Sequence, residues 1–217
     1  MTKGNRPLTV VRLVLPIGWV LASVGYFGPW IAHETAALTV SGVDLGEFVK
    51  FLPAILDGTL RVIRQMFYLP PLAVALGVAM LAGSWRLRYP WLLRLLMLIL
   101  AVQTSLQLLP PAWSPSSLTT SEFRLQAIAL GICWLLLAGF WLLRRLPSWL
   151  TGSVSTLLAL AAGGLPAWQF LVAKPAIDEV YRTPPSIGWG FFLCLTGLAA
   201  MAGASAALAL RNQGPTE

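Results

Sequence analysis

Six runs of about twenty apolar residues divide this 217-residue chain, and they limit its fold more than any other feature. A helix needs about 20 apolar residues to cross the roughly 30 Å hydrocarbon core of a bilayer, because lipid offers no partner for an unpaired peptide group. The composition agrees, since 57% of the residues are hydrophobic and 11% are charged, against about 25% charged in soluble domains. The sequence predicts an all-α integral membrane protein, a six-span transmembrane helical bundle that forms one membrane domain over residues 1–217. The predicted spans are residues 10–30, 67–86, 91–109, 124–143, 148–171 and 187–210.

Basic residues between the spans predict the orientation. The side that holds both termini carries nine Lys and Arg residues and one acid, whereas the other side carries six basic residues and seven acids. Because positively charged loops stay in the cytoplasm, we expect a multi-pass protein of the plasma membrane with both termini cytoplasmic. The formal net charge of +7 is then a charge for anionic lipid headgroups, so membrane lipids are expected partners and nucleic acid is not.

The longest connection, about residues 31–66, is predicted to form an amphipathic extracytoplasmic cap. Ser41 can cap a helix start and Pro53 can end it, and apolar residues between them recur at the i, i+3, i+4, i+7 spacing of one helix face: Leu45, Phe48, Val49 and Leu52. A second amphipathic helix is expected over residues 55–64. The two helices are expected to lie on the outer membrane face.

Three charged residues of the predicted cap are expected to face water and bind a partner: Asp44, Glu47 and Lys50. This combination of an ordered amphipathic helix and mixed charge occurs nowhere else in the chain. We therefore expect a non-enzymatic accessory or scaffolding subunit of a larger membrane assembly, with other membrane protein subunits as partners.

Ionisable residues are missing from the middle of every predicted span, which argues against a proton relay or an intramembrane enzyme. The single histidine, His33, stands beside Glu34 just beyond the first span. The two residues could form an acid–base or metal-binding pair, or an ordinary solvated loop pair. Cys133 and Cys194 lie in apolar runs without metal-ligand spacing. We expect no catalytic residue, metal or cofactor.

Amide side chains provide the main polarity inside the spans: Gln103, Gln107, Gln126 and Gln169. They can be hydrogen-bonding glue between helices. Alternatively they can line an outward-facing polar vestibule, which is typical of a small permease or the membrane component of a transporter. These two interpretations correspond to the two candidate functions.

Small residues spaced four apart predict close helix packing on two spans. One set is Ala75, Ala79 and Gly83, and the other is Ala199, Gly203 and Ala207. Such ladders let a neighbouring backbone approach closely, either inside one bundle or between subunits. One sequence does not separate these two uses.

Overall fold

Helices make up most of the computed structural model, which describes residues 6–35, 38–84, 87–109, 114, 116–143, 145–181 and 183–210. Among these residues, four helical segments are long and apolar enough to cross a membrane. They are α1 (Arg6–Phe27), the 3-10 helix η3 (Arg64–Tyr68) continued by α4 (Leu69–Ala82), α8 (Ser148–Val180), and α9 (Trp189–Leu210). These four candidate spans indicate a multi-pass helical membrane protein. Residues 1–5, 85–86 and 211–217, which include the end of the second predicted span, lie outside the described residues.

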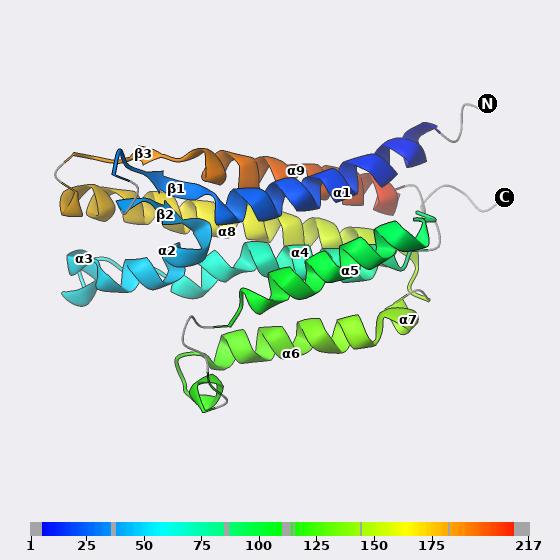
Figure 1. The fold of residues 1–217 in the computed structure, drawn as a ribbon, viewed down its shortest axis with the longest axis horizontal. Helices are drawn as coiled ribbons and strands as arrows, with labels where there is room; N and C mark the ends of the chain where they lie inside the picture. The colour runs from blue at the N-terminus through cyan, green and yellow to red at the C-terminus, as the bar shows by residue number, and fades with distance from the viewer. Residues whose placement is uncertain are drawn as a thin grey trace.

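The third and fourth predicted spans are shorter than expected. α5 (Trp91–Leu106) has 16 residues and α6 (Arg124–Ala138) has 15. At 1.5 Å per residue these helices reach about 24 and 22 Å, less than the hydrocarbon core. Gly139 ends α6 before the short α7 (Phe140–Leu143). The two helices lie on one side of the bundle, beside α4 (Figure 1).

α4 is the central helix of the bundle. It is apolar all round, and nearly all of its residues are buried against α5, α8 and α1, as expected for a helix without a polar face. α1 packs most extensively against α9, and their backbones almost touch. A β-carbon on Gly25 would be 2.1 Å from Cys194 N, and one on Gly197 would be 2.2 Å from Ala22 N.

The two predicted small-residue ladders lie in different surroundings. Ala75, Ala79 and Gly83 are buried inside the bundle. Ala199 and Gly203 face outward, and a β-carbon on Gly203 would meet nothing within 4 Å. α9 turns its Cys194 and Gly197 face toward α1, which leaves the other ladder outside the packed interior; Ala207 is half-buried.

A three-stranded antiparallel sheet, which was not predicted, covers one end of the bundle. β1 (Pro29–Ala32) lies between β2 (Val40–Ser41) and β3 (Ser186–Ile187). The first span was predicted to reach residue 30, but α1 ends at Phe27 and the chain turns into β1 at Pro29. A proline that cannot donate to a helix fits this break.

The described part of residues 31–66 is only partly helical. α2 (Gly42–Phe48) begins as predicted, because the Ser41 hydroxyl accepts a hydrogen bond from the Asp44 N–H. η2 (Val49–Phe51) continues it, and Leu45, Val49 and Leu52 are buried as the apolar spacing predicted. The second predicted helix is wrong over most of residues 55–64: α3 (Pro53–Leu56) has four residues and stops before Gly58, whose φ is +79°.

α8 is longer than the predicted span of residues 148–171. It has 33 residues, about 50 Å at 1.5 Å per residue, and Pro166 and Pro175 lie within it. Its last turns extend to the same end of the molecule as α3 (Figure 1). The hydropathy of the sequence hides this extension, because Lys174 and Asp178 are charged. They form an ion pair along the helix.

Candidate functional site

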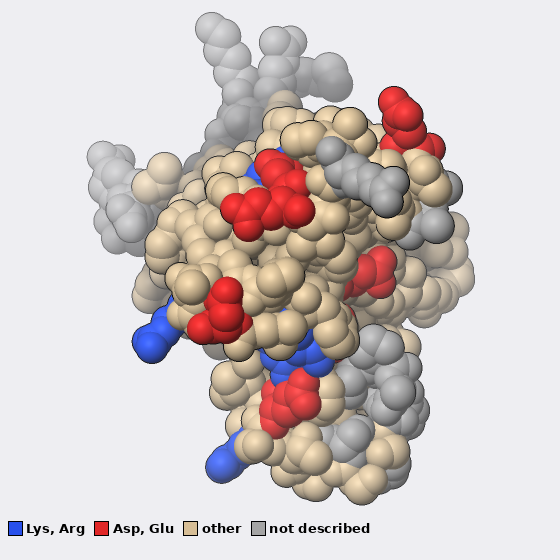
Figure 2. All heavy atoms as spheres, turned by 90° about the vertical axis from the view of Figure 1, so that its left-hand side faces the viewer, with Lys and Arg blue, Asp and Glu red and all other residues tan. Residues whose placement is uncertain are grey.

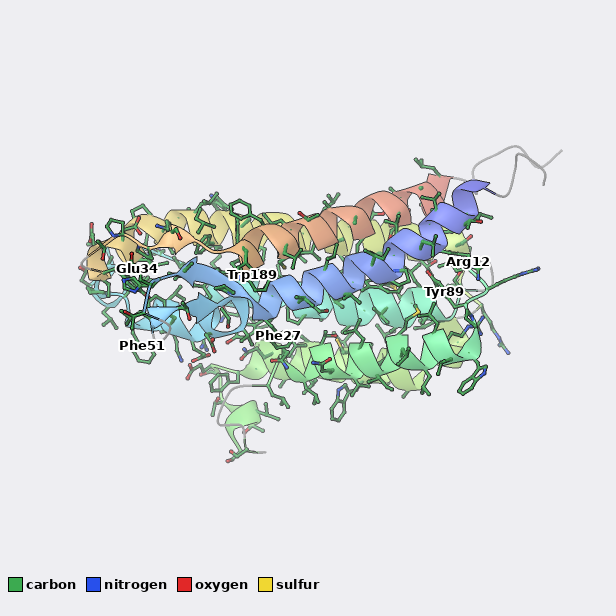
Figure 3. The ribbon with its side chains drawn as sticks, turned by 45° about the horizontal axis from the view of Figure 1, so that its top comes forward. Arg12, Phe27, Glu34, Phe51, Tyr89 and Trp189 are labelled. Atoms are coloured by element: carbon green, nitrogen blue, oxygen red, sulfur yellow. The ribbon has the colours of Figure 1, made fainter. Side chains whose placement is uncertain are left out.

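Acidic side chains gather at one end of the molecule, opposite the start of α1 and the end of α9; we call it the distal end. Figure 3 places Glu34 and Phe51 there and Arg12 and Tyr89 at the opposite end. Figure 2 shows the acidic residues spread over the distal face. All the acidic residues that the structure describes lie in the segment from β1 to the C-cap of α3, just before α6, or in the last turns of α8. They are Glu34, Asp44, Glu47, Asp57, Glu122, Asp178 and Glu179.

Four charged residues form an ionic cluster at this end: Glu47, Lys50, Arg64 and Glu122. Lys50 Nζ lies 2.5 Å from Glu47 Oε2 and 3.0 Å from Glu122 Oε1. Arg64 Nη1 lies 3.1 Å from Glu47 Oε1, and Arg64 Nη2 lies 3.0 Å from Glu122 Oε1. Each acid therefore contacts both bases. The cluster joins α2 and η2 to η3 and to the segment that precedes α6.

Arg64 is the most buried member of the ionic cluster, with a side chain that is 12% exposed. Its guanidinium donates a further hydrogen bond to the Glu122 backbone oxygen at 3.1 Å and lies 5.4 Å from the centre of the Phe123 ring. Tyr68 Oη donates to Glu47 Oε1 at 3.0 Å. A buried charge is tolerated when it is paired and hydrogen-bonded in this way. The cluster therefore attaches the described part of residues 31–66, which we call the cap segment, to the segment just before α6 and to η3.

Hydrogen bonds within the cluster favour the charged forms of its two more accessible members, Lys50 and Glu122. The bond to Glu47 is the main cause that raises the pKa of Lys50. The hydrogen bond from Lys50 lowers the pKa of the Glu122 carboxyl below its ordinary value. Both shifts favour the ionised form at neutral pH, because each partner stabilises the other's charge.

The three predicted partner-binding residues lie in different surroundings. Asp44 is exposed, and its carboxylate accepts a hydrogen bond from the Ser41 hydroxyl at 2.5 Å. Glu47 and Lys50 instead belong to the ionic cluster. The sequence pattern does not reveal this, because Arg64 and Glu122 are distant in the chain and carry no spacing that relates them to α2.

Exposed apolar side chains mark the far tip of the cap segment, and we call Phe51, Pro53 and Leu56 the tip patch. Phe51 is 72% exposed and Leu56 is 73% exposed, and Pro53 between them is also exposed. Leu56 falls within the second amphipathic helix that was expected over residues 55–64. The early end of α3 turns it outward instead, beside the exposed Asp57.

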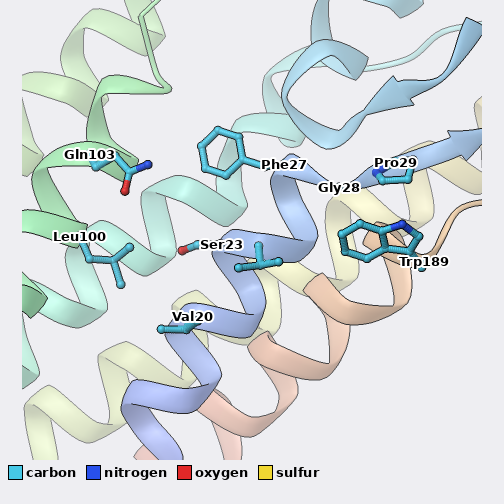
Figure 4. A pocket seen from close by; sticks show the side chains of 9 residues that line it. Val20, Ser23, Phe27, Gly28, Pro29, Leu100, Gln103 and Trp189 are labelled. Atoms are coloured by element: carbon cyan, nitrogen blue, oxygen red, sulfur yellow. The ribbon is translucent and has the colours of Figure 1, made fainter. Parts of the chain in front are cut away.

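The four glutamines do not share one cavity. Gln169 is buried and accepts a hydrogen bond from the Ile63 N–H at 3.0 Å. Gln103 lines a groove between α1 and α5 (Figure 4), and Gln107 follows the last residue of α5. Gln126 lines a separate pocket of about 150 Å³ with Tyr68. Gln126 is 5% exposed, and its amide is close to the Tyr68 hydroxyl, but neither amide atom makes a hydrogen bond of good geometry among the described residues.

His33 and Glu34 border a pocket of about 360 Å³ at the distal end, opposite Pro184 and Pro185. His33 Nδ1 accepts a hydrogen bond from the Thr35 N–H at 3.1 Å, and its ring centre lies 5.4 Å from that of Tyr181. The hydrogen bond and the ring contact therefore both fix the position of the imidazole. Glu34 is exposed beside it.

Comparison with protein-family models, with curated proteins and with solved structures finds no match to this chain. Within the described ranges, no three His, Cys, Asp or Glu side chains come together as a metal site requires. The candidate features of the described surface are the ionic cluster, the tip patch and the cavities beside the glutamines.

Proposed function

We propose that this chain is a non-enzymatic accessory or scaffolding subunit of a larger membrane assembly, and that it binds another membrane protein through the tip patch. The observation that supports this proposal is the exposure of Phe51 and Leu56, 72% and 73%. Exposed apolar residues are ordinary on a lipid-facing helix. Grouped on a surface in water, they mark an interaction site.

The length of α8 supports a position of the tip patch in water. About 20 residues from Ser148 fill the hydrocarbon core, and the remaining turns extend about 20 Å further. The cap segment is attached to this outer part, because Gln169 accepts from the Ile63 N–H and Tyr181 Oη donates to Leu38 O at 2.9 Å. Along the long axis of the molecule, α3 extends about as far as the end of α8 (Figure 1).

The charge distribution supports an extracytoplasmic cap and cytoplasmic termini in a plasma membrane. The described basic residues away from the distal end are Arg6, Arg12, Arg88, Arg94 and Arg145, and an excess of arginine is typical of the cytoplasmic side. In this proposal α6 with α7 forms one span of about 30 Å. The shorter α5 completes a six-span bundle by local thinning of the bilayer.

Asp57 indicates the chemistry of the partner. It follows Leu56 directly and is exposed, and hydrogen bonds from the Thr59 backbone N–H and hydroxyl lower the pKa of its carboxyl. It has no ion-pair partner within the described part of the chain. The partner that fits this surface offers apolar side chains for the tip patch and a Lys or Arg for Asp57.

Co-purification of the full chain in a mild detergent tests the proposal. Phe51→Ser with Leu56→Ser should abolish recovery of a stoichiometric membrane partner and leave the thermal unfolding midpoint unchanged. The matched control, Leu157→Ser with Leu160→Ser, alters two exposed apolar residues of α8 and should retain the partner. Asp57→Lys should weaken recovery through like-charge repulsion. The proposal is wrong if the wild-type chain purifies alone, or if the tip variant recovers the same partner in the same amount.

A further inference from the structure

A groove of about 440 Å³ lies on the side of the bundle between α1, α5 and the first residue of α9 (Figure 4). We call it the lateral groove. Its walls include Val20, Val24, Leu100 and Trp189. Val20 and Val24 belong to the candidate span Leu8–Phe27 and are about half exposed. The groove therefore opens toward the hydrocarbon of the bilayer and is separate from the tip patch.

A buried hydroxyl without a partner points into the lateral groove. Ser23 is 8% exposed, and its Oγ makes no hydrogen bond in the described structure. Hydroxyls on helices usually donate to their own backbone, as Thr104 does to Leu100 O and Thr196 does to Phe192 O, both at 2.8 Å. Ser23 does not. Figure 4 shows its hydroxyl directed toward α5, where Gln103 stands on the opposite wall.

The depth of these two polar groups limits what can reach them. Ser23 precedes the end of α1 by four residues, and Gln103 precedes the end of α5 by three. They therefore lie about 6 and 5 Å inside the distal helix ends, near the boundary between headgroups and acyl chains. The groups of a bilayer that accept hydrogen bonds at this level are the ester carbonyls of its glycerolipids.

We propose that the lateral groove binds the ester-linked end of a membrane glycerolipid. The acyl chain lies along Val20, Val24 and Leu100, and the ester carbonyl accepts hydrogen bonds from the Ser23 hydroxyl and the Gln103 amide. The carbonyl satisfies a buried donor that is otherwise unpaired. Trp189 at the groove mouth suits the interface, where indole rings are favoured. A lipid that only coats the bundle would not depend on the Ser23 hydroxyl or the Gln103 amide.

An ester lipid and its ether analogue provide the test, because the ether lacks the carbonyl. The purified full chain is reconstituted in an equal mixture of a diester phosphatidylcholine and the matching diether phosphatidylcholine, and the lipid retained in mild detergent is counted by native mass spectrometry. One hydrogen bond in lipid favours the ester by about threefold and two by about eightfold. Wild type should retain the diester by that larger factor. Ser23→Ala should reduce the preference to about threefold, and Ser23→Ala with Gln103→Leu should abolish it.

Thr196→Ala is the matched control, because it removes an outward-facing hydroxyl from α9, and it should keep the wild-type preference. Equal retention of the two lipids by wild type would overturn the proposal and show annular lipid only. So would an undiminished preference in Ser23→Ala. If Ser23→Ala fails to fold, Leu100→Trp replaces it, since filling the groove from α5 should abolish the ester preference while the unfolding midpoint stays unchanged. A Leu100→Trp chain that keeps the preference would equally refute the site.

Discussion

Gly42 at the start of α2 lies directly against Trp30, so that a β-carbon at residue 42 would be 2.7 Å from Trp30 Nε1. The indole ring is held in place by its other contacts. Its Nε1 donates to Gly25 O at 3.2 Å, and its ring makes edge contacts with Phe170 and Phe191, whose ring centres are 5.7 and 5.2 Å away. Gly42 is therefore where the cap segment meets the aromatic core of the bundle.

Gly42→Ala should lower the free energy of unfolding by about 1–3 kcal/mol, because an added methyl group in a packed site forces neighbours to shift. The measurement is chemical unfolding in detergent, followed by tryptophan fluorescence. Gly131→Ala is the control: a β-carbon there meets nothing within 4 Å, so stability should stay the same or rise slightly, as alanine favours a helix. Equal effects of the two substitutions would show that the Trp30 contact is unimportant.

Arg64→Ala should destabilise the protein by about 1–3 kcal/mol, because it removes the largely buried guanidinium that donates to Glu47 and to the Glu122 backbone oxygen, and leaves Glu47 with Tyr68 and Lys50 alone. The same unfolding measurement checks this. Arg61→Ala removes an exposed arginine three residues earlier and should change stability by less than about 0.5 kcal/mol. If both variants unfold alike, the ionic cluster does not hold the cap.

The ionic cluster should lose stabilising energy in acid. In the folded protein the Lys50 hydrogen bond lowers the pKa of Glu122, so the unfolded chain binds the proton more readily as pH falls below the ordinary glutamate value of about 4.3. This contribution is present at neutral pH and is lost as pH falls through the lowered pKa. Unfolding midpoints should therefore fall less for Glu122→Gln than for wild type between about pH 5 and pH 3. Parallel curves for the two proteins would contradict this expectation.

Gln126→Leu should keep or raise the unfolding midpoint, because it removes a buried amide that lacks hydrogen bonds in the described structure. Gln169→Leu is the comparison, since it deprives the Ile63 N–H of its acceptor and should lower stability by about 1 kcal/mol. A marked loss in Gln126→Leu would indicate that ordered water or a solute occupies the pocket beside Tyr68. That result would favour the permease interpretation.

Cysteine labelling in intact cells tests the orientation. Arg61→Cys at the distal end should react with an impermeant maleimide, whereas Leu146→Cys, between α7 and α8, should react only after the cells are opened; both positions are exposed. Wild type serves as the background control, because Cys133 and Cys194 are buried. The opposite pattern would reverse the proposed topology.

Hydropathy predicted the approximate positions of the long helices, and a capping signal predicted the start of α2, because these signals are local. Ser41 predicted the start of α2, and the spacing of Leu45 and Val49 predicted its buried face. The sheet could not be predicted in this way. Its β3 strand has two residues, and Ile187 pairs with Ile31 across most of the chain, so neither alternation nor turn chemistry records the pairing.

The candidate site shows the same division between local and distant information. Charge identified Glu47 and Lys50 as special residues of the cap segment, but Lys50 meets Glu122 across 72 positions. The exposure of Leu56 depends on the end of α3 after four residues. The apolar periodicity predicted that the helix would continue to residue 64. Ser23 carries no sequence signal at all, since its role arises from the groove between α1 and α5.

The pairing of α1 with α9 also governs the order in which this protein can fold. α1 precedes every other described helix in the chain, yet its most extensive contacts are with α9, which follows all the others. Gly18 and Gly25 have their close neighbours on α9. The glycine face of α1 therefore lacks its packing partner while the helices between α1 and α9 are inserted. The α1–α9 pair can form only once α9 has been made, by a long-range contact whose loop-closure cost is met at that stage.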